Sequence, residues 1–325
     1  MQFLRSYWWL LALFIVMVVA AIIFIPGDFR KYDYPHAGNG FEWNAPDINR
    51  VPNTPAGDLI RYGNDIIANT AVYFGPKGKI APISNGMNCQ NCHLAAGTKP
   101  WGNNYSAVAS TYPKFRARSG SIETIYKRIN DCFERSLDGK SIDSNSHEMI
   151  AIAAYIKWLG ANVPKNEKPY ASGIIDLPFL NRAANPVKGK EIYAQNCQRC
   201  HAADGQGTWN ADSTAYQYPP LWGNNSYNTG AGLFRVGRLA GYVKHNMPFD
   251  QDQKEDVRPL TDEESWDVAA YILSQPRPVK KFAQDWPDIS AKPYDHPFGP
   301  YRDSFSESQH KYGPFEMIVA AKKRK

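Results

Sequence analysis

Two cysteines and a histidine stand together in Asn88-Cys89-Gln90-Asn91-Cys92-His93, a Cys-x-x-Cys-His motif. The motif recurs in Asn196-Cys197-Gln198-Arg199-Cys200-His201. In this pattern the two thiols bond covalently to a porphyrin edge and the histidine supplies the proximal ligand of its iron. A redox dithiol or half of a zinc site would not require the trailing histidine, which both copies have. The sequence therefore predicts two covalently attached haem c groups, with His93 and His201 as iron ligands.

The repeat helps to locate the second axial ligand of each iron. Asn246-Met247-Pro248 is similar to the methionine loop of class I cytochromes c, and a thioether ligand raises the reduction potential. Met247 precedes Tyr271 by 24 residues, and 23 residues before the corresponding Tyr155 stands Cys132. Cys132 is also the only cysteine outside the two motifs. The spacing thus favours Met247 and Cys132 as the distal ligands.

Other interpretations of these residues remain open. An isolated cysteine is more often a small core residue than a ligand, but the matched position favours ligation by Cys132. Met149 and His147 are alternative ligands, although they fall in the closing helix of the first repeat, and His245 is an alternative to Met247. The histidines outside both repeats are interpreted as surface or packing residues: His36, His296 and His310.

Residues Ser121 to Leu137, which include Cys132, are predicted to form one helix. Ser121 is expected to cap its N-terminus, and Glu123 to interact with the positive end of its dipole. The apolar side chains of this segment recur at steps of three and four and share one face: Ile122, Ile125, Ile129 and Cys132.

Arginines gather around the lone cysteine. Arg128 and Ser136 lie four residues either side of Cys132, on the same stripe of a helix, and Arg116 and Arg118 come just before it. A guanidinium favours the thiolate form of a neighbouring cysteine, so the group is suited to binding an anion and attacking it. The alternative is that some of these arginines bind the haem propionates, and we expect this of at least one of Arg118, Arg128 and Arg116.

The elements around the motifs follow one plan. A helix is predicted before each motif, from about Gly57 to Tyr73 and from about Val187 to Gln195, and each repeat ends in an amphipathic helix, Ser146 to Leu159 and Thr261 to Leu273. Thr261 and Glu264 form a capping box. The predicted fold is mainly α, with two fused class I cytochrome c domains at residues 56–165 and 186–278. Residues 166–185 are the linker and 279–325 a tail rich in proline and aromatic residues.

Composition limits the function classes. The net charge of +6 is modest and partly due to the closing Lys322-Lys323-Arg324-Lys325, which is a weak argument for nucleic-acid binding. Four of the five cysteines belong to the motifs, so no structural disulfide is expected within the chain. Because the net charge is modest, nucleic acid is not an expected partner.

The N-terminal segment predicts export. Tyr7 to Ile25 are nineteen residues without a charge or a proline, enough for one transmembrane helix. Arg5 before the run leaves the N-terminus in the cytoplasm. Residues 1–25 are thus predicted as a membrane anchor, with a cleaved signal peptide as the alternative, and residues 26–55 as a spacer. The body is expected on the periplasmic side of a bacterial inner membrane, or free in the periplasm after cleavage.

Longer segments around Cys132 resemble one family, the dihaem, tetrathionate-forming thiosulfate dehydrogenases. The resemblance covers about Gly57 to Gln275. It rests on the first motif and on three further segments: Gly102-Asn103-Asn104-Tyr105, Tyr112-Pro113-Lys114-Phe115-Arg116-Ala117-Arg118-Ser119-Gly120 and Arg128-Ile129-Asn130-Asp131-Cys132-Phe133-Glu134-Arg135-Ser136. It implies two fused class I cytochrome c domains, with the active site at the first haem.

The resemblance also implies roles for individual residues. It implies His93 and Cys132 as ligands of the first haem iron, and His201 and Met247 as ligands of the second. The positions that match the substrate pocket are Arg118, Arg128 and Ser136. Some relatives have a lysine just before the methionine and exchange ligands there. This chain has Asn246, which favours stable His/Met ligation.

The implied activity is the oxidative coupling of two thiosulfate ions to tetrathionate. Electrons would pass from the first haem to the second and then to an external acceptor, another cytochrome or redox protein. The alternatives are a tetrathionate reductase using the same site in reverse, a membrane-anchored dihaem electron carrier without catalysis, and an enzyme for another sulfur oxyanion such as sulfite.

Overall fold

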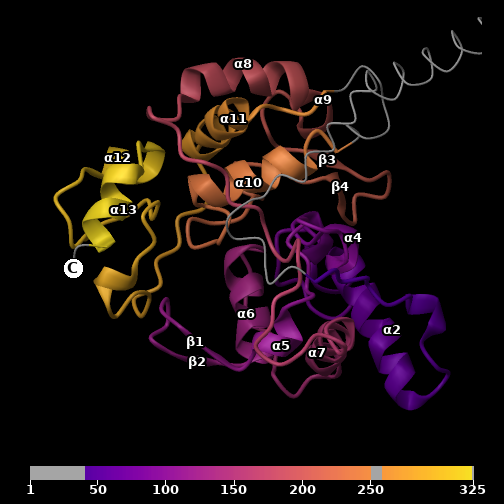
Figure 1. Cartoon of the computed structure of the whole chain (residues 1–325). Coiled ribbons are helices and arrows are strands. Elements are labelled where there is room, and N and C mark those ends of the chain that lie inside the picture. Colours follow the sequence, from indigo (N-terminus) through magenta and orange to yellow (C-terminus); the bar gives the residue numbers. More distant parts are fainter. Residues whose placement is uncertain (1–40, 250–257, 324–325) are drawn as a thin grey trace, which may run out of the picture. The chain divides into compact units, whose positions relative to one another are not determined.

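The computed structural model of this chain describes residues 41–249 and 258–323. Its regular elements are mostly α-helices joined by long loops, with two small antiparallel sheets of two strands each (Figure 1). The predicted membrane segment, residues 1–25, lies outside the described residues, as does His36. Within the described ranges, no helix is both long enough and apolar enough to cross a bilayer.

The first repeat begins with the helix expected before its motif. The helices of this repeat are α2 (Pro55–Ala68), α3 (Thr70–Phe74), α4 (Leu94–Gly97), α5 (Val108–Thr111), α6 (Ile125–Arg135) and α7 (His147–Leu159). The single helix predicted to Tyr73 is interrupted at Asn69, whose side-chain amide bonds to the Asp65 carboxylate at 2.7 Å. Such local side-chain bonds compete with helical backbone bonds, which explains the break. The closing helix predicted from Ser146 begins at His147, and Ser146 caps it by accepting the Met149 N–H.

The second repeat uses the same pair of crossing helices. Its helices are α8 (Pro186–Asn196), α9 (Gln198–His201), α10 (Val236–Asn246) and α11 (Asp262–Ser274). α8 packs on α11 as α2 packs on α7. At each crossing a glycine faces a backbone carbonyl: a Cβ on Gly63 would lie 2.0 Å from the Ala151 oxygen, and one on Gly189 would lie 2.0 Å from the Asp267 oxygen. The predicted capping box of Thr261 and Glu264 is confirmed.

Two short hairpins interrupt the helices. β1 (Lys114–Arg116) pairs with β2 (Ser121–Glu123), and β3 (Thr208–Trp209) pairs with β4 (Tyr216–Tyr218). The predicted helix from Ser121 is therefore wrong over its first turn: α6 begins at Ile125 and is capped by Thr124. Gly120, at φ +62°, belongs to the turn that brings β2 back along β1, and pairing with β1 overrides the helical spacing.

Two side chains lie elsewhere than the predicted helix would place them. Ile122, predicted on the buried face with Cys132, is 72% exposed on β2. Glu123, predicted at the helix N-terminus, is buried on β2 with a carboxylate oxygen 3.9 Å from Nε of Arg116. The remaining face is as predicted, because Ile125 and Ile129 are buried in the core of the first repeat.

The C-terminal segment is folded against the second repeat. It contains the short helix η3 (Ile289–Ala291), α12 (Glu307–Tyr312) and α13 (Glu316–Lys323) (Figure 1). Phe315 contacts the ring of Trp266 in α11, with centroids 5.6 Å apart. The predicted tail is thus partly helical and packed.

Candidate functional site

The second motif lines a cavity of about 360 Å³. Cys197, Cys200 and His201 lie on its wall, and Met247 reaches the same cavity from the C-terminal end of α10. Much of the remaining wall is apolar and includes Leu221, Leu239, Val243, Val268 and Ile272. Two thiols, an imidazole and a thioether around an apolar cavity fit a covalently attached haem c, which needs thioether attachment points and axial N or S ligands.

Both motif histidines are oriented by a backbone carbonyl. Nδ1 of His93 lies 2.6 Å from the Asn103 oxygen, and Nδ1 of His201 lies 2.8 Å from the Pro219 oxygen. A hydrogen bond at Nδ1 leaves Nε2 for a metal. Burial lowers the pKa of His93 to about 4 and also lowers that of His201, so both rings are neutral, as a metal ligand must be.

The cysteines of the first motif are partly buried and pack against the core of the first repeat. Burial raises the pKa of the Cys89 thiol and of the Cys92 thiol to about 12, and the nearby Cys132 adds to both shifts. Uncharged sulfur in an apolar setting suits a thioether link to haem. Ile129 and Phe133 of α6, the helix that carries Cys132, belong to the core against which both motif cysteines pack, so this helix lies beside the first motif.

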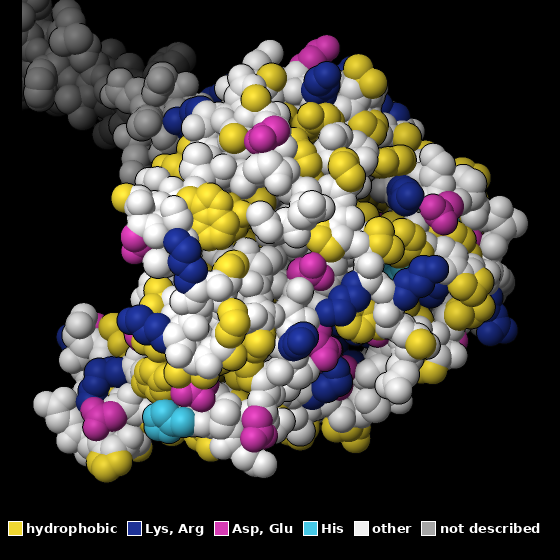
Figure 2. Space-filling view, turned by 180° about the vertical axis from the view of Figure 1, so that it is seen from behind, with side chains coloured by type: hydrophobic (Ala, Val, Ile, Leu, Met, Phe, Trp, Pro, Cys, Tyr) yellow, Lys and Arg dark blue, Asp and Glu magenta, His cyan; other side chains and the backbone are white. Residues whose placement is uncertain are grey.

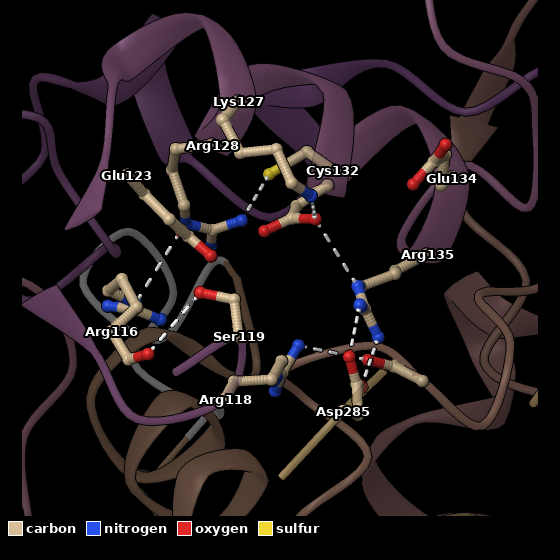
Figure 3. A network of polar contacts seen from close by, with 12 residues as sticks. Arg116, Arg118, Ser119, Glu123, Lys127, Arg128, Cys132, Glu134, Arg135 and Asp285 are labelled. Carbon is tan, nitrogen blue, oxygen red and sulfur yellow. Dashed lines mark hydrogen bonds and ion pairs between the residues drawn. The ribbon is translucent and has the colours of Figure 1, made fainter. Parts of the chain in front are cut away.

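Cys132, on the helix beside the first motif, accepts a hydrogen bond from Arg128. Arg128 Nη1 donates to the Cys132 sulfur at 3.1 Å, one helical turn away on α6 (Figure 3). This sulfur is the main cause of the raised pKa of the half-buried Arg128 guanidinium, which remains charged. A guanidinium aimed at a cysteine sulfur next to a haem-attachment motif can bind an anion and stabilise a thiolate.

The other predicted pocket residues lie around this pair in different ways. Arg118, in the β1–β2 turn, points its guanidinium into the network of Figure 3, where Nη1 donates to the Gly230 oxygen at 3.2 Å. Ser136 follows the last residue of α6 and its backbone N–H bonds to the Cys132 oxygen at 2.9 Å. Arg116 faces the buried Glu123. The structure thus brings Arg118, Arg128 and Cys132 into one region.

Desolvation lowers the pKa of Arg118 to about 10, and the nearby Arg135 and Arg128 add to this effect. Several guanidiniums therefore share a small, poorly solvated region. Such an arrangement is costly for the folded protein and attractive to an anion.

Three residues of this region have no counterpart in the sequence-based prediction. Arg135 on α6 forms a bidentate ion pair with Asp285, with both N–O distances 2.7 Å (Figure 3). Trp286 donates its backbone N–H to the Arg118 oxygen at 2.6 Å. Asp285 and Trp286 belong to the C-terminal segment. A separation of 150 residues from Arg135 leaves no local pattern that would have indicated the pair.

The alternative ligands have other surroundings. Met149 is fully buried in the core of the first repeat, and the His147 ring stacks on Tyr62 with centroids 5.2 Å apart. The His245 ring lies 6.2 Å from that of Trp101. Of the histidines outside the repeats, His310 is buried against Asp303 and His296 bonds to the Phe298 oxygen, so both have packing roles as predicted.

The first motif also borders the cavity of the second. Met87, Asn91 and Cys92 are part of its wall. The Tyr242 hydroxyl of α10 donates to the Asn91 oxygen at 3.0 Å, which joins the second repeat to the first motif. Short separation between redox groups is what electron transfer between them requires.

Family models match both repeats. One, described as cytochrome c, matches residues 186–276, and one described as SoxA/TsdA, cytochrome c domain, matches residues 80–164. Among curated proteins, the chain is 36% identical to a thiosulfate dehydrogenase of Psychrobacter arcticus over 247 residues, which cover 76% of this chain and 72% of that protein. It is 40% identical to a thiosulfate dehydrogenase of Allochromatium vinosum over 201 residues, or 61% of this chain and 72% of the relative.

A solved structure is similar as well. The as-isolated thiosulfate dehydrogenase (TsdBA) of Marichromatium purpuratum aligns with a TM-score of 0.67 at 29% identity, covering 73% of this chain. The chain spans half the length of that protein, 50%. Together with the two motifs, these likenesses establish two cytochrome c domains with two covalently bound haem c groups. The chain therefore belongs to the thiosulfate dehydrogenase family, oxidoreductases that act on sulfur compounds.

Proposed function

We propose that this protein couples two thiosulfate dianions into tetrathionate beside the first haem. The observation that carries the proposal is the 3.1 Å contact between Arg128 Nη1 and the Cys132 sulfur, next to the first motif. His93 and Cys132 are the proposed ligands of the first iron, and His201 and Met247 those of the second. The curated relatives, named as thiosulfate dehydrogenases, support the choice of substrate.

Charge is the first obstacle to the reaction. Two dianions repel each other, so a site that holds both needs fixed positive groups. Arg128 and Arg118 supply guanidiniums whose paired N–H groups match sulfonate oxygens, and the Ser136 hydroxyl is proposed to add a hydrogen bond. Because these groups lie where water is scarce, their attraction for an anion is stronger than at an exposed surface.

Cys132 is the proposed nucleophile. Its thiolate forms a bond to the outer sulfur of the first thiosulfate, and two electrons leave as the sulfur–sulfur bond forms. The outer sulfur of the second thiosulfate then attacks that bond, so tetrathionate departs and the Cys132 thiolate is restored. Arg128 stabilises the thiolate before the first step and after the second.

Bound haem c groups would supply the redox chemistry that takes up the two electrons. Cys132 would hold the first group and Met247 the second. A thiolate ligand would give the first a lower potential than a thioether ligand gives the second. The first motif contributes to the wall of the second motif's cavity, which supports electron transfer between the two groups. The proposed final acceptor is an external cytochrome or other redox protein.

The proposed organisation of the chain follows the sequence. Residues 56–165 form the catalytic domain and 186–278 the electron-transfer domain, joined by 166–185 and followed by 279–325. Residues 1–25 are proposed to anchor the protein at the periplasmic side of the inner membrane, since their apolar run is long enough to span it. Fractionation of cells that express the full chain would test the anchor: a soluble, shortened protein would contradict it.

The central test compares the holoprotein with Cys132→Ala and Met149→Leu. We expect thiosulfate-dependent reduction of an acceptor cytochrome, with one tetrathionate formed per two thiosulfate, and a loss of at least 1000-fold in Cys132→Ala because the nucleophile is gone. Met149→Leu, which alters the alternative ligand, should keep the rate and the haem spectrum.

Equal rates in the wild type and Cys132→Ala would overturn the mechanism. A spectrum without thiolate ligation in the resting wild type would overturn the assignment of Cys132 as a ligand. Reduction of tetrathionate faster than oxidation of thiosulfate, measured at matched driving force, would favour the reverse activity.

A further inference from the structure

The C-terminal segment reaches back to the arginines of the first site. Lys280 Nζ donates to the Glu134 and Gly139 oxygens at 3.2 and 3.0 Å, at the C-terminal end of α6. Five residues later, Asp285 holds Arg135 through two bonds of 2.7 Å each. The segment thus follows the end of the helix that carries Cys132.

The same segment packs on the β1–β2 turn. Pro287 lies against Gly120, where an added Cβ would be 2.5 Å from the Pro287 Cγ. Trp286 donates its N–H to the Arg118 oxygen at 2.6 Å, and the Arg118 guanidinium carbon lies 5.7 Å from the Trp286 ring centroid. Arg118 is therefore held at its backbone and its side chain by one residue of the distant segment.

Trp286 adopts a costly backbone conformation to do this. Its φ is +61°, in the left-handed region that bulky side chains rarely adopt. Such strain persists only where surrounding contacts impose it, and it often accompanies functional sites. Here the surrounding contacts are those to Arg118, together with an edge-to-face contact to His296 with centroids 5.4 Å apart.

Arg118 retains an unused donor. Its Nε is buried and has no hydrogen-bond partner, while Nη1 binds the Gly230 oxygen. A buried guanidinium donor without a partner costs free energy unless a ligand completes it. The segment around Trp286 holds Arg118 in this incomplete state.

Arg135 is restrained in a similar way. Its guanidinium carbon lies 3.6 Å from the Phe282 ring centroid, and only about 5% of the residue is exposed. Asp285 balances part of the positive charge shared by Arg118, Arg128 and Arg135, and it favours the charged form of Arg118. Without it, repulsion would separate these groups.

We infer that residues 280–287 form one wall of the substrate site and that Trp286 and Asp285 are positioning residues for its arginines. Trp286 fixes Arg118 so that its guanidinium is ready for an oxyanion of thiosulfate. Asp285 holds Arg135 and keeps the guanidiniums close together. The inference deepens the proposed function and rests on it for the identity of the substrate.

The test uses the full-length holoprotein and four variants: Trp286→Gly, Trp286→Phe, Asp285→Asn and Asp303→Asn. Glycine at 286 keeps the backbone N–H and relieves the strained φ, so it removes the ring contact while sparing the fold. Phenylalanine keeps a ring face for Arg118. Asp303→Asn is the matched control, because Asp303 pairs with His310 inside the C-terminal segment.

Two quantities are measured: KM and kcat for thiosulfate oxidation, and the Kd of thiosulfate for electrochemically reduced protein, by calorimetry, where oxidation cannot proceed. We expect Trp286→Gly and Asp285→Asn to raise KM and Kd about 5- to 20-fold, with kcat less affected and the haem spectrum unchanged. Trp286→Phe and Asp303→Asn should stay within twofold of the wild type.

The outcomes separate the two proposals. Normal KM and Kd in active Trp286→Gly and Asp285→Asn proteins would overturn the wall while leaving the proposed function intact. In a second outcome, thiosulfate binds to the wild type and only weakly to both variants, but no protein oxidises it. This result would overturn the proposed function and support the wall. Equal losses in Asp303→Asn would indicate general loosening of the segment and would overturn the inference.

Discussion

Arg128 contacts Cys132 because α6 places residues four apart on one stripe, and both ends of that contact are polar groups inside a mostly apolar repeat. A guanidinium that is partly removed from water needs a partner, and the cysteine sulfur provides one. This pairing was predictable from spacing alone. The orientation of Arg118 was not, because it depends on Gly230 and Trp286, which lie more than 100 residues away.

Arg128→Lys should show whether the guanidinium itself is required. A lysine keeps the charge but cannot make two parallel bonds to a sulfonate. We expect kcat/KM for thiosulfate to fall about 10- to 100-fold, or about 1.4–2.8 kcal/mol of transition-state stabilisation. Steady-state kinetics on the holoprotein would measure it.

The matched control for this change is Lys127→Ala. Lys127 is the neighbouring residue on α6, and its ammonium pairs with Asp131 at 2.5 Å on the more exposed side. The substitution Lys127→Ala removes a positive charge from the same turn of α6 and leaves the contact between Arg128 and Cys132 in place. A comparable loss in Lys127→Ala would mean that overall charge, and not the guanidinium contact, attracts the substrate.

At the scale of elements, the helices next to the motifs were predicted well and the hairpin before α6 was not. Apolar spacing and the Ser146 and Thr261 caps are local signals, and α7 and α11 begin where these signals stand. Residues 121–123 also have helical spacing, but pairing with β1 decides their structure. A hairpin with only three residues in each strand is too short to leave a clear alternating pattern in the sequence.

The helix crossings give a prediction on stability. Gly63→Ala or Gly189→Ala would place a methyl group 2.0 Å from a backbone oxygen of the crossing helix. Neither backbone can move without disturbing its repeat, so we expect each change to lower the free energy of unfolding by about 2–4 kcal/mol. Chemical denaturation of the holoprotein, followed by circular dichroism, measures the change.

Gly232→Ala is the control for the crossings. No heavy atom lies within 4 Å of the position of its Cβ, and its φ is outside the left-handed region. Its stability should stay within about 0.5 kcal/mol of the wild type. Equal, small effects at all three glycines would contradict close packing at the two crossings.

At the scale of the whole molecule, the C-terminal segment links the first repeat to the rest of the chain. Its composition, rich in proline and aromatic residues, gave no indication of this role, because each of its main contacts joins residues far apart in sequence. Asp295 illustrates this: it is buried and pairs with Arg235 at the start of α10, 60 residues away. Tertiary contacts of this kind depend on the folded surface that the segment meets.

The attachment of this segment should depend on pH through His296. Burial lowers the pKa of His296 to about 4 from an ordinary value of 6.5, and the nearby cations Lys292, Arg235 and Arg118 act in the same direction. The folded protein therefore holds this ring neutral, whereas the unfolded chain protonates it near pH 6.5. The contribution of His296 to the free energy of unfolding is therefore fully present above pH 6.5 and is lost as the pH falls towards 4.

We expect a loss of about 2 kcal/mol over this range. His296→Gln, which cannot be protonated, should remove that part of the pH dependence. The measurement is the difference in unfolding free energy between wild type and variant from pH 7.5 to 4, in which contributions from His93, His201 and the carboxylates cancel. Parallel curves for the two proteins would show that His296 is solvated in the folded protein and would contradict its buried position beside Trp286.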